Sequence, residues 1–194
     1  LLPSEHAPVT ALKVAELFAE AGFPAGAFNV VTGLGAEIGD TLTCHPQVRM
    51  VGFTGSSRIG HHISALCGKH AKRYSLEMGG KNPLVILQDA ELDKAVQGSV
   101  IGSFLYQGQI CMASSRIYVE KSIHDHFLTK FLAAVQSLGM EDLRSPSTMI
   151  GPIIHERQRK RIKQHLHDAI SKGATVRCGG NWKGNRCEPT VLTG

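Results

Sequence analysis

Short apolar runs and longer apolar stripes alternate along the chain, and this alternation predicts strands and helices in turn. Runs of β-branched and aromatic residues predict five strands, at residues 28–31, 48–53, 74–77, 84–87 and 117–119. Helical spacing predicts helices at about residues 11–21, 57–66, 89–107, 122–135 and 155–171, with another near Cys44. Strands and helices joined by short connections favour an α/β fold, with a parallel sheet and helices on its faces.

Two of the predicted helices have a continuous apolar face. In the helix at residues 11–21 this face consists of Leu12, Ala15, Leu17, Phe18 and Ala21. In the helix that follows Ser122 it consists of Ile123, Phe127, Phe131 and Val135. Such faces indicate that each helix packs against a core. The expected N-caps are Thr10, Asp89 and Ser122, and Gly22 is expected to end the first helix.

The strand and helix pattern restarts after Gly79 and Gly80, which predicts two domains, residues 1–79 and 80–194. A chain of 194 residues, 42% of them hydrophobic, is long enough to bury a sizeable core. No run approaches the 18 apolar residues of a membrane helix, and no signal-peptide pattern opens the chain. Since the chain opens without methionine and stops at Gly194 within a domain-like stretch, we expect a piece of a longer subunit.

The cysteines limit the possible chemistry and the compartment. There are five, an odd number, and no two are spaced as CxxC: Cys44, Cys67, Cys111, Cys178 and Cys187. This pattern argues against a disulfide framework and against a zinc cluster, so we expect no metal site. It favours a reducing compartment, and we therefore expect a cytoplasmic protein.

The formal net charge of +5 is concentrated in the basic run at residues 157–163. No aromatic residues are interleaved with this run, as they are in many single-stranded nucleic-acid binding surfaces. The run is therefore interpreted as the solvated face of a helix, and we expect neither a nucleic-acid partner nor a membrane partner.

One cysteine lies in a sequence suited to nucleophilic chemistry. Cys111 follows Gln107-Gly108-Gln109-Ile110 and precedes Met112-Ala113-Ser114. Thiolate chemistry needs exposure and room for a substrate, and the small residues Gly108, Ala113 and Ser114 provide that room. The other four cysteines are expected to be small buried hydrophobic residues. Tyr106 and Met112, which flank the loop, are candidates for lining a substrate tunnel.

A candidate general base, Glu77, lies 34 residues before Cys111, in Leu76-Glu77-Met78-Gly79-Gly80-Lys81. A carboxylate beside two glycines at a strand end is accessible and suited to accepting a proton from water. Taken alone, however, a glutamate in a turn is most often simply solvated.

A candidate phosphate site follows the predicted strand 48–53, in Phe53-Thr54-Gly55-Ser56-Ser57-Arg58-Ile59-Gly60. Here a helix N-terminus offers free N–H groups and a partial positive charge. Gly55 allows close approach of the backbone, Ser56 adds a hydroxyl, and Gly60 allows tight helix packing. The alternative interpretation is a capped strand-to-helix turn with no ligand.

A second glycine pattern is less informative. Gly33, Gly35 and Gly39 are spaced as GxGxxxG rather than as the dinucleotide fingerprint GxGxxG. A tight turn with close helix packing is therefore the preferred interpretation.

Together these segments resemble the aldehyde dehydrogenase superfamily. The resemblance rests on Gly-Gln-x-Cys at Cys111, on Leu-Glu-x-Gly-Gly-Lys at Glu77, on their order and spacing, and on the segment 53–60. It implies part of a Rossmann-like NAD(P)-binding domain at 1–79, followed by part of an α/β catalytic domain at 80–194. It also implies that Cys111 is the nucleophile and Glu77 the general base, and that the cofactor contacts are Glu5, Gly35, Phe53, Thr54, Gly55, Ser56, Ile59, Met78 and Gly79.

The opening residues depart from the family in one position. Pro3-Ser4-Glu5 resembles the family's Lys-Pro-Ser-Glu, whose lysine and glutamate bind the adenosine ribose, but Leu2 stands where the lysine is expected. Glu5 accepts hydrogen bonds from ribose hydroxyls and repels a 2′-phosphate, which favours NAD over NADP, although NADP stays possible. Lys81 matches a structural lysine of the motif, with no expected role in the chemistry.

The implied activity is oxidation of a small-molecule aldehyde to a carboxylic acid by NAD(P)+, through a thiohemiacetal and a thioester on Cys111. A coenzyme-A-acylating aldehyde dehydrogenase is an alternative, but Glu77 favours hydrolysis. An inactive structural fragment is another, although Cys111 and Glu77 are both intact. The resemblance implies a homo-oligomeric parent enzyme, and truncation implies low or no activity of this chain alone.

Overall fold

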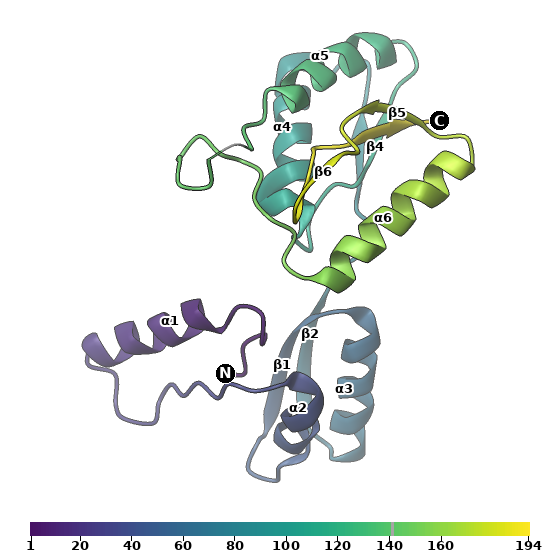
Figure 1. Cartoon of the computed structure of the whole chain (residues 1–194). Helices are drawn as coiled ribbons and strands as arrows, with labels where there is room; N and C mark the ends of the chain where they lie inside the picture. Colours follow the sequence, from purple (N-terminus) through teal and green to yellow (C-terminus); the bar gives the residue numbers. More distant parts are fainter. Residues whose placement is uncertain (141) are drawn as a thin grey trace. The chain divides into compact units, whose positions relative to one another are not determined.

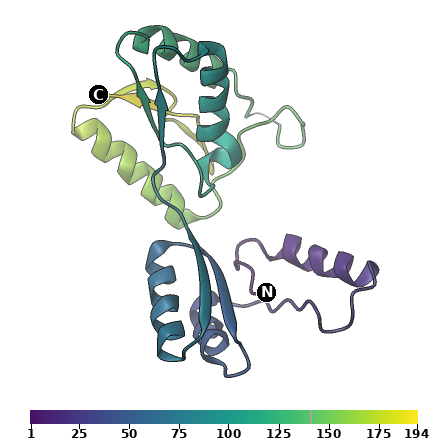
Figure 2. The same cartoon turned by 180° about the vertical axis from the view of Figure 1, so that it is seen from behind.

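The computed structural model describes residues 1–140 and 142–194 (Figures 1 and 2). The chain divides into two compact units, Leu1–Met78 and Gly79–Gly194, each of which is described by itself. Both units contain parallel strands joined through helices, which confirms the expected α/β class.

The first unit is built on a parallel strand pair. Strand β1 (Met50–Gly55) pairs with β2 (Arg73–Met78), and helix α3 (Ser57–Lys69) connects them. Helix α2 (Gly35–Cys44) packs on α3. Gly60 and Cys67 are the buried residues of α3. The strand–helix–strand unit expected from the sequence is therefore present.

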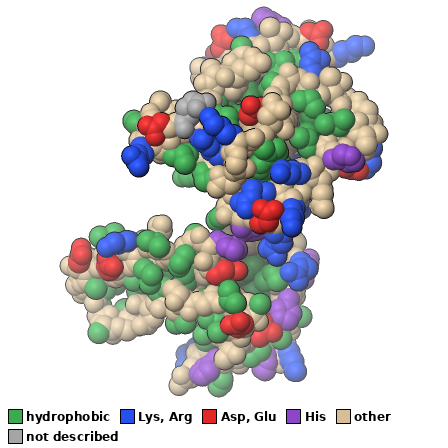
Figure 3. All heavy atoms as spheres, viewed as in Figure 1, with side chains coloured by type: hydrophobic (Ala, Val, Ile, Leu, Met, Phe, Trp, Pro, Cys, Tyr) green, Lys and Arg blue, Asp and Glu red, His purple; other side chains and the backbone are tan. Residues whose placement is uncertain are grey.

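Helix α1 (Pro8–Glu20) begins earlier than expected, because proline suits the first turn of a helix. Ala7 is the N-cap and makes no side-chain bond, so Thr10 is not the cap. The helix ends as expected, with Gly22 at a φ of +78°. Its apolar face does not enter a core, because no residue of α1 is buried and Leu17 is 60% exposed. Figure 3 shows hydrophobic side chains on the surface of this helix.

The expected strand at residues 28–31 is not formed. Leu1 donates its terminal amine to the carbonyl of Asn29 at 2.7 Å and accepts from the Val31 N–H at 3.0 Å. This is the bonding pattern of parallel strands. It extends over a single residue of the partner segment, which is too short to form a strand.

The second unit contains the larger core. Strand β3 (Pro83–Ile86) pairs in parallel with β4 (Arg116–Val119). Helices α4 (Leu92–Phe104) and α5 (His124–Gln136) pack against each other, and the short 3-10 helix η1 (Leu105–Gly108) follows α4. The core cluster consists of Ile86, Val96, Phe127, Phe131 and Val135, which confirms the predicted apolar face of α5.

The two N-caps predicted in this unit are wrong. The N-cap of α4 is Glu91 rather than Asp89, and that of α5 is Ile123 rather than Ser122. Neither cap makes a side-chain hydrogen bond, so core packing rather than capping sets these helix starts. Helix α4 also ends before Gln107, because the backbone leaves the helical conformation at Leu105, whose ψ is 130°.

The C-terminal region consists of the predicted basic helix and two antiparallel strand pairs. Helix α6 spans Glu156–Ser171. The strand pairs are β5 (Thr175–Cys178) with β8 (Val191–Thr193), and β6 (Trp182–Lys183) with β7 (Arg186–Cys187). Within the described residues no helix is long and apolar enough to cross a membrane.

Replacing Phe131 by alanine should destabilise the second unit by about 3–5 kcal/mol, because the side chain is only 3% exposed and its loss leaves a cavity in the core. Urea denaturation of the chain, followed by circular dichroism, measures this change. Val85→Ala is the matched control, since Val85 is 62% exposed on β3. Equal midpoints for the two variants would contradict the assigned core.

Candidate active site

The cysteine loop, residues 105–115, begins with a backbone reversal. Tyr106, Gln107 and Gly108 have consecutive positive φ values of 51°, 60° and 69°. A side chain at Gly108 would also lie 3.0 Å from the carbonyl oxygen of Ser103, so only glycine fits there. Left-handed conformations at the two non-glycine residues cost about 1 kcal/mol or more each, and they persist only where surrounding contacts hold them.

The side chain of Gln109 holds the start of the loop. Its Nε2 donates to the carbonyl of Pro152 at 3.2 Å, and its Oε1 accepts from the Ile154 N–H at 2.9 Å. The Gln109 amide therefore binds the neighbouring 152–154 segment through both its donor and its acceptor.

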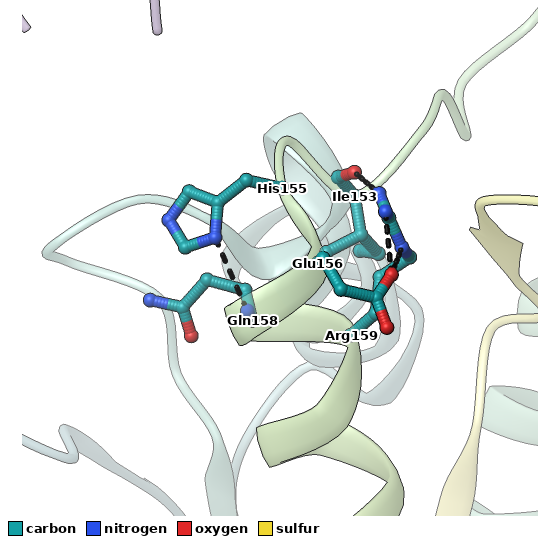
Figure 4. A network of polar contacts seen from close by, with 5 residues as sticks. All are labelled: Ile153, His155, Glu156, Gln158 and Arg159. Carbon is teal, nitrogen blue, oxygen red and sulfur yellow. Dashed lines mark hydrogen bonds and ion pairs between the residues drawn. The ribbon is translucent and has the colours of Figure 1, made fainter. Parts of the chain in front are cut away.

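That neighbouring segment is itself fixed at the N-terminus of α6 (Figure 4). The ring Nδ1 of His155 accepts from the Gln158 N–H at 3.3 Å and caps the helix. Arg159 donates to the Ile153 carbonyl at 3.3 Å and to the Glu156 carboxylate at 2.7 Å. The Arg159 hydrogen bond lowers the pKa of Glu156, so that carboxylate stays charged beside the positive end of the helix.

Cys111 occupies the second position of a tight turn in which the Ala113 N–H donates to the Ile110 carbonyl at 3.1 Å. Cys111 is exposed to solvent. In the described structure, the backbone N–H groups of Cys111 and Met112 donate to no protein acceptor. An accessible sulfur therefore lies beside two backbone donors that are free to bind an anion.

The other cysteines are in different surroundings. Cys67 is fully buried, as expected, whereas Cys44, Cys178 and Cys187 are only partly buried, because they lie at helix and strand ends rather than in a core. Burial raises the pKa of the Cys178 and Cys187 thiols. Cys111 is the exposed cysteine of the chain.

The first unit gathers most of the expected cofactor residues at the carboxyl end of its parallel strands. The register pairs Thr54 with Glu77 and Gly55 with Met78. The residues brought together here, by pairing or by chain continuity, are Phe53, Thr54, Gly55, Ser56, Ile59, Glu77 and Met78. Ligands of parallel α/β sheets bind outside this edge.

The turn from β1 into α3 is capped by a side chain and packed closely at its two glycines. Ser56 is the N-cap, and its Oγ accepts from the Ile59 N–H at 3.5 Å. The N–H groups of Ser57 and Arg58 find no acceptor among the residues described. A side chain at Gly55 would lie 2.5 Å from the Phe53 ring, and one at Gly60 would lie 2.5 Å from the Met78 sulfur. A side chain at either glycine would therefore have to displace its neighbour.

Three expected residues are not part of this group. Glu5 lies in the turn before α1, with its carboxylate 3.8 Å from the His6 ring. Gly35 is the first residue of α2. Gly79 belongs to the second unit, where a side chain at its position would lie 4.0 Å from the Cys111 Cα.

Two amide side chains of the site were not assigned a role from the sequence. Gln109 stands in the Gly-Gln-x-Cys pattern, which is a signal that could have drawn attention to it. Asn82 donates to the carbonyls of Cys111 at 2.8 Å and Ala113 at 3.3 Å, and no sequence pattern indicates these long-range bonds. Lys81 contributes its carbonyl, which accepts from Arg116 at 2.5 Å. Tyr106 and Met112 are 64% and 67% exposed.

Comparison with known proteins gives a consistent result. The family model described as "Aldehyde dehydrogenase family" matches residues 1–194. The succinate-semialdehyde dehydrogenase [NADP(+)] of Escherichia coli is 42% identical over 195 residues, which cover 99% of this chain and 40% of that protein. The benzaldehyde dehydrogenase of Bacillus subtilis is 41% identical over 193 residues, with the same coverage.

Solved structures agree with this similarity. An NADP-dependent enzyme of Escherichia coli superimposes with a TM-score of 0.95 at 41% identity, over 99% of this chain and 40% of that one. The NAD-dependent aldehyde dehydrogenase of Sinorhizobium meliloti gives 0.94 at 36% identity, over 99% and 39%. The chain thus spans about 40% of the length of these relatives.

At pH 7, iodoacetamide should label Cys111 at least about tenfold faster than Cys178 or Cys187. The reagent reacts with the thiolate, and a raised pKa leaves less thiolate at Cys178 and Cys187 at this pH. Because their pKa values are raised, the labelling rates of Cys178 and Cys187 should continue to increase with pH above the ordinary thiol pKa of about 8.5. Peptide mass spectrometry measures each rate, and unfolding in urea should make the rates similar. Equal rates in the folded chain would show that the assigned exposure is wrong.

Proposed function

The chain belongs to the aldehyde dehydrogenase family, and we propose that it carries the thiol and base chemistry of NAD(P)-dependent aldehyde oxidation. The observation that carries the proposal is the exposed Cys111 in a turn with two unpartnered backbone N–H groups. We assign cofactor binding to residues 1–79 and the thiol chemistry to residues 80–194.

The first step is attack of the Cys111 thiolate on the aldehyde carbon. A carbon–sulfur bond forms, the carbonyl π electrons move to oxygen, and a thiohemiacetal oxyanion results. The N–H groups of Cys111 and Met112 donate to this oxyanion. Such donors stabilise the charge that develops in the transition state, and because a turn holds them, little reorganisation is needed.

The residues at the carboxyl end of β1 fit a dinucleotide. The Ser56 hydroxyl and the N–H groups of Ser57 and Arg58, which find no acceptor among the described residues, would hold the pyrophosphate. When bound, NAD(P)+ accepts the hydride that leaves the former aldehyde carbon. Glu5 favours NAD by binding ribose hydroxyls and repelling a 2′-phosphate, although one close relative is named for NADP(+).

The last step is hydrolysis of the thioester on Cys111, for which we assign Glu77 as the general base. The carboxylate takes a proton from water while the water oxygen bonds to the acyl carbon. The carbon–sulfur bond then breaks, the thiolate of Cys111 is regenerated, and the carboxylic acid leaves. Sulfur suits both roles, because it is a good nucleophile and a good leaving group.

The aldehyde itself is assigned only as a class. The relatives named for succinate semialdehyde and for benzaldehyde differ by a single percentage point in identity to this chain. One is named for an anionic aliphatic aldehyde and the other for an uncharged aromatic one, so similarity over these residues does not discriminate between them.

The free cysteines support the expectation of a reducing compartment such as the cytoplasm.

Cys111→Ser should abolish NADH formation from succinate semialdehyde or benzaldehyde. Glu77→Gln should still give one burst of NADH, after which steady-state turnover should be about 10²- to 10⁴-fold slower than in the wild type. The burst follows because the first half of the reaction needs the thiol but not the base. Absorbance at 340 nm measures the burst, and mass spectrometry locates the acyl adduct on Cys111. Turnover by Cys111→Ser, or an adduct on another cysteine, would contradict the assignment. A chain that forms no adduct would favour the structural-fragment alternative, and release only by added coenzyme A would favour the acylating one.

Gly55→Ala should weaken NAD+ binding by about tenfold or more, because the new methyl group collides with the Phe53 ring and overpacking of this kind costs about 1–3 kcal/mol. Isothermal titration calorimetry measures the affinity. Gly52→Ala is the matched control on the same strand, since a side chain there meets nothing within 4 Å. Equal affinities for the two variants would exclude the 53–56 turn as the cofactor site.

A further inference from the structure

Asn82 lies between the 79–81 segment and β3, and its side chain reaches into the cysteine loop. Its Nδ2 donates to the Cys111 carbonyl at 2.8 Å and to the Ala113 carbonyl at 3.3 Å. Both acceptors are carbonyl oxygens, so the nitrogen rather than the oxygen of the amide must face the loop. The bond to the Ala113 carbonyl is partly buried, whereas the shorter bond to the Cys111 carbonyl is exposed.

These two bonds determine how the peptide groups around Cys111 are oriented. In a trans peptide the carbonyl and the following N–H point in opposite directions. The Ile110 carbonyl is held by the Ala113 N–H, so the Cys111 N–H points away from that bond. The Cys111 carbonyl is held by Asn82, so the Met112 N–H points away from Asn82. Both peptide planes that flank the Cα of Cys111 are thus fixed.

Other side chains hold only the ends of the loop. Gln109 binds the 152–154 segment, and the Ser103 hydroxyl donates to the Ser114 carbonyl at 2.9 Å. Across the described residues, Asn82 is the side chain that bonds to Cys111 itself. Gly79 lies alongside, since a Cβ at its position would be 4.0 Å from the Cys111 Cα, an ordinary van der Waals contact.

We propose that Asn82 is a positioning residue that holds Cys111 and its neighbouring N–H groups in the geometry needed for attack and oxyanion binding. This inference rests on the proposed function. Asn82 does not touch the substrate; it acts through the carbonyl of Cys111. Without it the peptide plane between Cys111 and Met112 can rotate, and a misplacement of about 1 Å is enough to slow a reaction about 10²-fold.

The first test is amide hydrogen exchange of the 194-residue chain, compared among wild type, Asn82→Ala and Asn82→Asp. Loss of the two Asn82 hydrogen bonds should raise exchange in peptides covering 109–114 about tenfold, because the turn that protects the Ala113 and Ser114 amides opens more often. Exchange in α5 should stay unchanged. Asn181→Ala is the matched control, because its Nδ2 donates to Glu188 at 2.8 Å, away from the loop.

Asn82→Asp separates hydrogen bonding from space filling. Aspartate has the shape of asparagine, but at neutral pH its carboxylate presents only acceptors to the two carbonyls. It should therefore raise loop exchange at least as much as alanine, and it should lower kcat by about 10- to 100-fold with KM for NAD+ unchanged. A residue that only fills space would leave Asn82→Asp close to wild type.

The outcomes are distinct. Faster exchange confined to 109–114 in both Asn82 variants supports the inference, whereas unchanged exchange there, or an equal rise in α5, overturns it. If Cys111→Ser abolishes turnover while Asn82→Asp keeps the wild-type kcat, the positioning role is wrong and the proposed function stands. If Cys111→Ser retains turnover, the proposed function fails, and the exchange measurement alone decides whether Asn82 holds the loop.

Discussion

Hydrogen bonds from side chains outside the turn hold Cys111 in place, and the candidate chemistry depends on them. The loop enters through a left-handed reversal at Tyr106 and Gln107 that is unfavourable for the isolated chain. Two contacts offset this strain: Asn82 binds the loop from outside it, and Gln109 binds the loop to the 152–154 segment. A reactive thiol must be exposed, so it cannot be held by burial in a core; polar contacts at its backbone hold it instead.

The first unit is organised by a different constraint, namely the absence of side chains at two glycines. Gly55 leaves space for the Phe53 ring, and Gly60 leaves space for the Met78 side chain. Because the two glycines carry no side chains, α3 lies close to β2. The first N–H groups of α3 then lie at the carboxyl edge of the parallel strands. Among the described residues, the Ser57 and Arg58 N–H groups at this edge have no protein acceptor, which fits the anionic ligand group that we propose.

The contrast among the cysteines follows from their surroundings. Burial disfavours the charged thiolate and raises the pKa of Cys178 and Cys187, which makes these thiols less reactive. Cys67, a residue of α3, is fully buried. The same residue type is therefore structural at these positions and chemically available at Cys111. Neither the number nor the spacing of the cysteines makes this distinction.

Local patterns in the sequence determined the strand–helix order, the buried face of α5 and the two segments that carry family membership, because these depend on residues close together in the chain. Capping was predicted poorly. Thr10 does not cap because α1 begins at Pro8, and Asp89 and Ser122 do not cap because packing of α4 and α5 outweighs a single side-chain bond. The apolar face of α1 was expected in a core but is largely exposed. Only the tertiary structure showed that Asn82 bonds to Cys111 and that Gly55 lies against Phe53, because such contacts depend on how distant segments and side chains meet in space.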